Sequence, residues 1–263
     1  MPAPPVLVPR APAGGVLTLD DPLFVSDLHL SAAQPRTQAR FLRFLREEAA
    51  QHAELLILGD LFEYWVGDDV ADDATELVAA LRALAARGVR VYLMHVNRDL
   101  LLGAGFAEAS SAQLLPDPTL ARCQGRWLLL AHGDAWCTAD LDYMRVRPRL
   151  RWAWAQRWFL RVPAGWRRRW IARARAASET RKQGRPVGIM DVTEAAVAQA
   201  LSDAGAEFAI HGHTHRPATH RMTIDGRTAE RWVLPDWDYD REPVRGGYLR
   251  FVDGAPQRVD LPA

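Results

Sequence analysis

Seven side chains of metal-binding types occur in short polar segments, each beside an apolar run. They are carboxylates, imidazoles and one amide: Asp27, His29, Asp60, Asn97, His132, His213 and His215. A mixed set of nitrogen and oxygen donors suits Mn²⁺, Fe²⁺, Zn²⁺ or Co²⁺ better than Ca²⁺. A carboxylate can bridge two cations, and Gly59 allows an ion to approach Asp60 closely. The pattern therefore predicts a metal site in which Asp60 is the bridging ligand.

The elements that must position these side chains alternate along the chain. Apolar runs predict five buried strands that end where the polar segments begin, at 23–25, 55–58, 89–94, 127–131 and 207–210. Apolar residues at helical spacing predict helices at 37–50 and 73–86. Such alternation favours an α/β fold, in which ligand groups gather in loops beyond the strand ends. Further strands are predicted at 231–234 and 247–252, with a turn at Asp225-Gly226.

The bulk composition is that of an ordinary globular chain. Of 263 residues, 49% are hydrophobic and 25% are charged, which excludes wholesale disorder. Cys123 and Cys137 form no CxxC pattern, so we expect reduced thiols in a cytoplasm. Residues 1–16 contain five prolines and no continuous apolar core, so we expect a flexible N-terminal tail. The remainder, 17–263, is expected to be one domain, and no apolar run reaches the ~18 residues that a membrane span needs.

A helical insertion is predicted at about 141–180, with breaks at Pro148 and Pro163. Residues 143–178 carry eleven arginines and no acid, so the rest of a chain of net charge +1 has a charge of about −10. Tryptophans lie among these arginines, at 152, 154, 158, 166 and 170.

Two interpretations of this insertion remain open. The combination of tryptophan and arginine suits an apolar surface that meets anionic headgroups. The alternative is a solvated basic helix pair whose tryptophans pack on the core. A nucleic-acid partner is not expected, because no module with regularly placed stacking aromatics is present.

The ordered series DxH, GD, N-R, HGD and GHxH is similar to that of the calcineurin-like metallophosphoesterases from Leu23 to Val252. This resemblance implies a four-layer α/β/β/α sandwich and a centre of two divalent metal ions. It implies one metal held by Asp27, His29, Asp60 and His215. The other metal would be held by Asp60, Asn97, His132 and His213, with His211 outside the ligand set.

The residue after Asn97 bears on the substrate. Many members of that superfamily have a histidine there that can protonate an alkoxide leaving group, whereas this chain has Arg98. Arginine does not give up its proton, but its guanidinium can clamp phosphate oxygens. A phosphate leaving group needs no such acid, because its second pKa is about 6. Arg98 therefore favours a phosphoanhydride over an alkyl ester.

A narrower resemblance rests on longer stretches in the same order. LGDLFEYWVGDD (58–69), HVNRDLLLGAGFA (95–107), HGDAWCTADLDYMRVR (132–147), IMDV (189–192) and HGHTHRPATH (211–220) resemble the UDP-2,3-diacylglucosamine pyrophosphatase family. That family implies attack of metal-activated water on the α-phosphorus of UDP-2,3-diacylglucosamine. The products would be UMP and 2,3-diacylglucosamine 1-phosphate (lipid X), an intermediate of lipid A synthesis.

The resemblance also implies roles for individual residues. Catalytic roles fall on Asp60, Asn97, Arg98 and His132. Substrate contacts are implied for Asn97, Arg98, Asp140, Tyr143, Ser178, Lys182, Arg185 and His213. Val96 replaces the family's glycine and is expected to restrict the loop that aims Asn97, and Pro235 also departs from the family pattern.

The family further implies Mn²⁺ as the metal, a helical lid over the acyl chains, and a monomer attached peripherally to the cytoplasmic face of the inner membrane. Two alternative functions remain open. One is a calcineurin-like phosphodiesterase or nucleotide pyrophosphatase that acts on a soluble substrate. The other is a protein-binding scaffold built on a remnant metal site, which the complete ligand series argues against.

Overall fold

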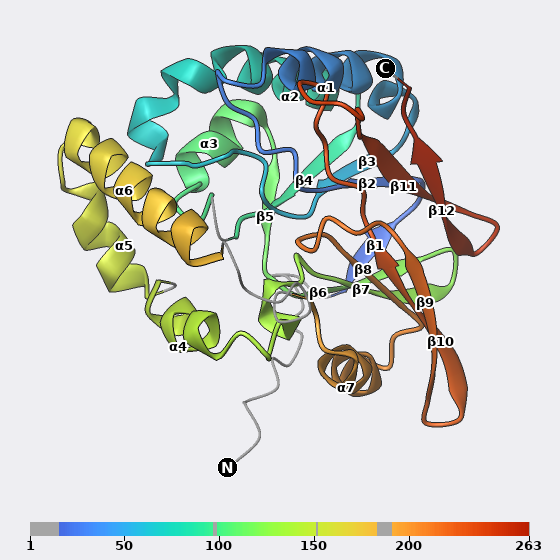
Figure 1. The fold of residues 1–263 in the computed structure, drawn as a ribbon. Coiled ribbons are helices and arrows are strands. Elements are labelled where there is room, and N and C mark those ends of the chain that lie inside the picture. The colour runs from blue at the N-terminus through green and yellow to red at the C-terminus, as the bar shows by residue number, and fades with distance from the viewer. Residues whose placement is uncertain (1–15, 97–98, 151, 183–190, 263) are drawn as a thin grey trace.

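The computed structural model describes residues 16–96, 99–150, 152–182 and 191–262, with side chains left out at 71–73, 149–150, 153 and 175–182. Its strands form two six-stranded mixed sheets (Figure 1). The five strands predicted before the polar segments and the two further strands predicted at 231–234 and 247–252 are all present. They are divided between the two sheets.

The first sheet has the order β12-β11-β2-β3-β4-β5. β2, β3, β4 and β5 are parallel, and β11 and β12 continue the sheet as an antiparallel pair. The bounds of these strands are β2 Pro22–Val25, β3 Glu54–Ile57, β4 Arg90–Met94, β5 Gln113–Leu115, β11 Gly247–Val252 and β12 Ala255–Asp260. The carboxyl ends of β2, β3 and β4 therefore meet at one edge, as the sequence predicts.

The second sheet has the order β1-β6-β7-β8-β10-β9. Its strands are β1 Leu17–Leu19, β6 Thr119–Cys123, β7 Arg126–Leu130, β8 Phe208–His211, β9 Thr219–Ile224 and β10 Arg227–Val233. β7 and β8 are parallel neighbours, and so are β8 and β10. The predicted turn at Asp225-Gly226 joins β9 to β10, with positive φ at both residues.

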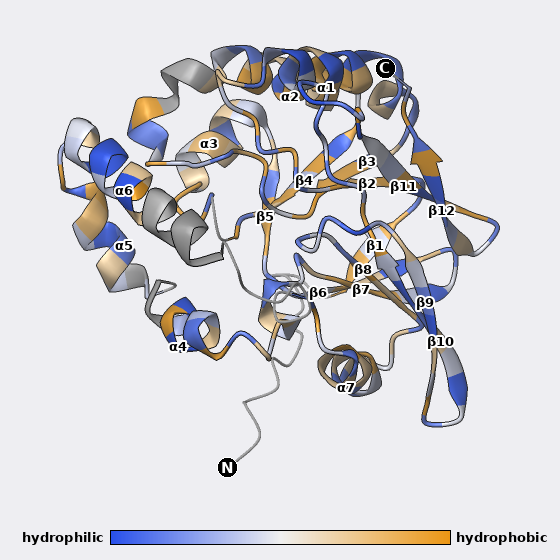
Figure 2. Cartoon of the chain, in the orientation of Figure 1, coloured by the Kyte–Doolittle hydropathy of each residue, from blue (hydrophilic) through white to orange (hydrophobic). Residues whose placement is uncertain are grey.

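Three hydrophobic clusters separate four layers. One lies between the first sheet and α1 (Pro35–Glu47), α2 (Thr75–Ala86) and α3 (Ala104–Ser110). A second fills the space between the two sheets, and a third lies between the second sheet and α7 (Glu194–Ala204). Figure 2 shows hydrophobic colour on the central strands and hydrophilic colour on the β9–β10 hairpin. The α/β/β/α sandwich that the resemblance implies is confirmed.

Three short 3₁₀ helices also lie in the described part of the chain. They are η1 (Ala49–Gln51), η2 (Asp68–Ala74) and η3 (Asp134–Trp136). The predicted helix at 37–50 is thus split into α1 and η1, and the one at 73–86 begins at Thr75.

The arginine-rich stretch forms three helices along one flank of the molecule (Figure 1): α4 (Leu141–Leu150), α5 (Ala153–Leu160) and α6 (Ala164–Lys182). Pro163 separates α5 from α6, but Pro148 lies inside α4, so a break there is wrong. A proline removes one helical hydrogen bond, and α4 ends two residues later. Among the described residues, no helix is long and apolar enough to cross a membrane.

The tryptophans and most of the described arginines of this stretch lie at the surface. All five tryptophans are 40–66% exposed, so packing of these rings on the core is wrong. Six described arginines are exposed, at 145, 157, 161, 168, 169 and 173. Arg147 and Arg167 are instead buried in ion pairs.

Candidate metal centre

Strands of both sheets deliver the proposed ligands to one place. Asp27 and Asp60 follow β2 and β3, whereas His132 follows β7 and His213 follows β8 in the other sheet. His213 Nδ1 lies 3.1 Å from His132 Nε2, and His29 Nε2 lies 3.2 Å from His215 Nε2. Side chains more than 180 positions apart in sequence therefore meet.

Asp60 lies between these two histidine pairs. Its Oδ2 atom is 3.9 Å from His29 Nε2 and 3.8 Å from His132 Nε2. Two groups of side chains could hold a metal ion, Asp27, His29 and His215, and Asp27, Asp60 and His132, so Asp27 belongs to both groups and Asp60 to the second. Each group contains carboxylate oxygen and imidazole nitrogen within 4.8 Å, a donor set that fits a divalent transition metal.

The ligand loops have an unusual backbone. Nine described residues other than glycine have positive φ, and five of them are proposed ligands: Asp27, His29, Asp60, His213 and His215. Such conformations cost free energy and persist where surrounding structure enforces them. Here the loops brace one another, since the Asp27 N–H donates to the Gly59 carbonyl (3.2 Å) and the His29 N–H to the Asp60 carbonyl (3.0 Å).

Asp27 is held rigidly and kept ionised. Its Oδ2 accepts hydrogen bonds from Ser26 Oγ (2.5 Å) and the His213 N–H (2.9 Å). Oδ1 is buried without a well-formed hydrogen bond among the described residues, and it faces His215 Nε2 at 3.3 Å. Burial disfavours the charge, but His215 and the other nearby imidazoles outweigh it and hold the Asp27 pKa well below its usual value. An ionised, incompletely bonded oxygen suits a cation.

His132 is buried with a fixed orientation. Its Nδ1 lies 3.0 Å from the Leu58 carbonyl, to which it can donate, leaving Nε2 directed at Asp60 and His213. Burial opposes protonation of the ring, but Asp60, Asp27 and other carboxylates raise its pKa to about 9 in the metal-free protein.

We expect metal binding to displace a proton from His132. Because its pKa is raised to about 9, the ring is protonated at neutral pH and must lose that proton before Nε2 can bind a metal. Mn²⁺ binding should release about one proton at pH 7.5, and apparent affinity should rise about tenfold per pH unit up to about pH 9.

In the metal-free protein, the stabilisation from this raised pKa is present below pH ~6.5 and is lost as pH rises through about 9.

Calorimetric titration with Mn²⁺ in two buffers of different ionisation enthalpy measures this proton release. The His132→Gln variant serves as the control, because it cannot carry the proton. A binding enthalpy that is the same in both buffers would contradict the assignment.

Acidic side chains flank the outer nitrogens of the other two histidines. Glu63 Oε2 lies 3.5 Å from His29 Nδ1, and Asp236 Oδ2 lies 3.7 Å from His215 Nδ1. Carboxylates in such positions orient metal-binding imidazoles and raise their basicity. Sequence reasoning missed Asp236, which directly follows Pro235, the residue that departs from the family pattern.

Asp99 is a second residue that sequence reasoning missed. It is fully buried, and its two oxygens accept hydrogen bonds from the N–H groups of Val96 and Leu61, both at 2.8 Å. Burial, reinforced by the charge of Asp60, raises its pKa to about 7. Asp99 thus joins the loop after β4 to the loop that carries Asp60, and the N-R-D triplet was the signal that could have identified it.

The restriction expected from Val96 concerns the loop to Asn97, which lies outside the described residues. Val96 itself is not among the described residues with positive φ, so its position does not require glycine. Its side chain is fully buried, and its Cγ2 would lie only 2.2 Å from a Cβ atom added at Gly59. The Val96 side chain therefore leaves no room for a side chain at position 59.

The remaining site predictions divide into three groups. Asn97, Arg98 and Arg185 lie outside the described residues, and the side chains of Ser178 and Lys182 in α6 do too. Asp140 and Tyr143 lie at the start of α4, where Asp140 Oδ1 accepts the Tyr143 N–H. His211 is buried against Trp136 with its Nδ1 near the Gly212 carbonyl, and burial beside Arg231 lowers its pKa to about 3.

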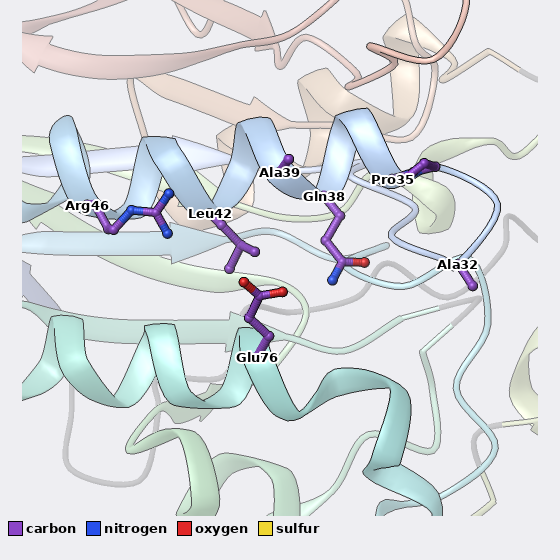
Figure 3. Close-up of a pocket in the computed structure, with 7 residues that line it drawn as sticks. All are labelled: Ala32, Pro35, Gln38, Ala39, Leu42, Arg46 and Glu76. Carbon is purple, nitrogen blue, oxygen red and sulfur yellow. The ribbon is translucent and has the colours of Figure 1, made fainter.

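A surface cleft elsewhere on the molecule is separate from this centre. It lies between α1 and α2 (Figure 3). It is lined by Ala32, Pro35, Gln38, Ala39, Leu42, Arg46 and Glu76. None of these is a proposed site residue.

Comparison with known proteins agrees with this geometry. The calcineurin-like phosphoesterase family model matches residues 22–217. A UDP-2,3-diacylglucosamine hydrolase of Ralstonia nicotianae is 48% identical over 88% of this chain and 89% of its own length. The chain belongs to the UDP-2,3-diacylglucosamine hydrolase family. Proteins of the same name from Nitrosococcus oceani and Bordetella pertussis are 45% and 44% identical, over 82% and 93% of this chain and 86% and 97% of theirs.

Membership of the UDP-2,3-diacylglucosamine hydrolase family places the chain among metal-dependent hydrolases. Calcineurin-like phosphoesterases use a dinuclear centre of divalent metals, and the ligand groups described above fit one. A solved archaeal phosphodiesterase aligns with 92% of this chain and 99% of its own at 9% identity and a TM-score of 0.45, a likeness too low to add to the assignment.

Proposed function

We propose that this chain hydrolyses the pyrophosphate bond of UDP-2,3-diacylglucosamine, giving UMP and 2,3-diacylglucosamine 1-phosphate for lipid A synthesis. The observation that carries the proposal is the convergence of five strand-end ligands with positive φ in a chain 44–48% identical to hydrolases of that name. Water is the attacking group, and the α-phosphorus is its target.

The centre would hold two metals, most suitably Mn²⁺ given its nitrogen and oxygen donors. Asp27, His29, Asp60 and His215 would hold one, and Asp60, Asn97, His132 and His213 the other. Two bound divalent cations supply Lewis acidity and make water a stronger nucleophile at neutral pH.

The chain's own side chains supply binding and orientation. Burial and repulsion from His132 lower the His213 pKa to about 3, so its ring is neutral and can bind a metal or accept a hydrogen bond from the substrate. Arg98 would clamp the phosphate oxygens and leave the departing phosphate unprotonated. Asp140, Tyr143, Ser178, Lys182 and Arg185 would contact the remainder of the substrate.

A substrate comparison tests the proposal against its main rival. The Mn²⁺-loaded protein is incubated with UDP-2,3-diacylglucosamine or with a dinucleoside polyphosphate, and products are separated by mass. We expect UMP and diacylglucosamine 1-phosphate from the first and negligible cleavage of the second. Hydrolysis of only the soluble nucleotide would keep the metallophosphoesterase chemistry and reject the lipid substrate.

We also propose that helices α4–α6 form a lid for the acyl chains and attach the protein, as a monomer, to the cytoplasmic face of the inner membrane. Trp154 and Trp158 are 66% and 60% exposed and lie one helical turn apart on α5. Exposed arginines lie beside them, including Arg157 and Arg161. Exposed indole rings beside basic side chains suit an interface with anionic lipid headgroups.

Co-sedimentation with lipid vesicles tests this attachment. The Trp154→Ser and Trp158→Ser double variant should lose about tenfold in affinity for anionic vesicles, because two exposed indole rings no longer enter the interface. Wild-type protein with uncharged vesicles is the control for the contribution of arginine. Equal binding of wild type and variant would reject this face as the attachment surface.

A further inference from the structure

Arg147 lies in α4 and, unlike most described arginines of this stretch, is buried. It is 7% exposed, and its guanidinium lies between two carboxylates. Its Nε donates to Asp134 Oδ2 at 2.6 Å, and its Nη2 donates to Asp134 Oδ1 and Asp117 Oδ2, both at 3.3 Å. Burying a charge is costly unless the charged group is paired and hydrogen-bonded. These contacts therefore hold the Arg147 side chain in one position.

Both carboxylates connect Arg147 to the segment that carries His132. Asp117 Oδ1 accepts the backbone N–H of His132 at 3.2 Å. Asp134 is fully buried two residues after His132, at the start of η3. A continuous set of hydrogen bonds therefore runs from the α4 guanidinium to the backbone of a proposed metal ligand.

The same carboxylate also binds a proposed substrate contact. Tyr143 Oη donates to Asp134 Oδ2 at 2.6 Å, one helical turn before Arg147 on α4. Asp140 accepts the Tyr143 N–H at 3.1 Å and so begins the same helix. Asp134 is thus shared by the helix that would contact substrate and the loop that would hold metal.

We infer that Arg147 is a positioning residue, which fixes the loop that carries His132 relative to the start of α4. The metal and the substrate are thereby held in the correct positions relative to each other. The inference deepens the proposed function and rests on it for the substrate, but the contact with the His132 loop stands independently. If Arg147 positions the His132 loop, its substitution changes metal affinity. A residue that only stabilised α4 would leave metal affinity unchanged.

The test compares Arg147→Lys with Arg167→Lys in the full-length protein. Arg167 is a matched control, because it is also buried in a helix of the same stretch and pairs with Asp69 (Nη1 to Oδ1, 2.9 Å) and the Val66 carbonyl. A lysine keeps the charge but cannot reach two carboxylates at once. Thermal unfolding checks that both variants fold.

Calorimetric titration of the metal-free proteins with Mn²⁺ is the first readout. We expect Arg147→Lys to weaken Mn²⁺ binding about tenfold, in the range seen when outer-shell support of a ligand is lost, and Arg167→Lys to leave it unchanged. With UDP-2,3-diacylglucosamine, Arg147→Lys should lower kcat about tenfold, whereas Arg167→Lys should mainly raise KM.

Unchanged Mn²⁺ affinity in a folded Arg147→Lys protein would overturn the inference. If Arg147→Lys does not fold, Asp117→Asn provides the second test, since it leaves an oxygen for the His132 N–H while weakening the pairing with Arg147; wild-type Mn²⁺ affinity in that variant would overturn the inference equally. Failure of wild-type protein to cleave the lipid substrate would reject the proposed function and leave the affinity result interpretable.

Discussion

The Asp60→Asn variant should lose about 1000-fold in kcat, equivalent to about 4 kcal/mol of transition-state stabilisation. The reason is its position, since one carboxylate oxygen lies within 3.9 Å of imidazole nitrogens from both ligand groups. An amide keeps the shape but carries no charge, so it cannot compensate two cations in the same way. Steady-state kinetics at saturating Mn²⁺ and metal analysis of the purified variant measure the effect.

Asp253→Asn is a matched control for this change. Asp253 has the same φ of 51° as Asp60, but it is exposed in the turn between β11 and β12. We expect wild-type kcat and metal content from Asp253→Asn. Near-normal turnover of Asp60→Asn would show that Asp60 does not bridge the two metals.

A methyl group at Gly59 should disable the site almost as strongly. An added Cβ would lie 2.2 Å from Val96 Cγ2 and 2.8 Å from His132 Nδ1, and the φ of +94° disfavours any side chain. Both the backbone and the His132 ring would have to move. We expect Gly59→Ala to lose at least about 100-fold in kcat and about 2–3 kcal/mol of stability.

Gly88→Ala separates the clash from the backbone strain. Gly88 also has φ of +94°, but no atom lies within 4 Å of its added Cβ. It should lose stability through strain alone, about 1 kcal/mol, with unchanged kcat. Thermal unfolding and kinetics of both variants give the comparison, and equal kcat values would reject contact with His132 as the cause.

The strand-end chemistry was predictable from the sequence because it is local. Each of the runs before Asp27, Asp60 and His132 is short, apolar and followed by a polar segment, and all three became strands. The division of those strands into two sheets was not predictable from alternation. It depends on long-range pairs such as β7 with β8, and only the family resemblance implied it.

Residues that act through tertiary contacts were the ones sequence reasoning missed. Asp99 and Asp236 are single carboxylates in loops, and their role follows only from the N–H groups and imidazole that the fold brings beside them. Arg147 and Arg167 were grouped with the other arginines of residues 143–178, because the sequence alone does not distinguish a buried arginine from an exposed one. Their burial against Asp134 and Asp69 is set by how α4 and α6 pack.

Phosphorus NMR of the Mn²⁺-loaded protein acting on UDP-2,3-diacylglucosamine in ¹⁸O-labelled water tests the central claim most directly. We expect ¹⁸O in the phosphate of UMP and none in diacylglucosamine 1-phosphate, because water attacks the α-phosphorus, with no turnover by His132→Ala. Label in diacylglucosamine 1-phosphate, or equal turnover by the variant, would contradict the account.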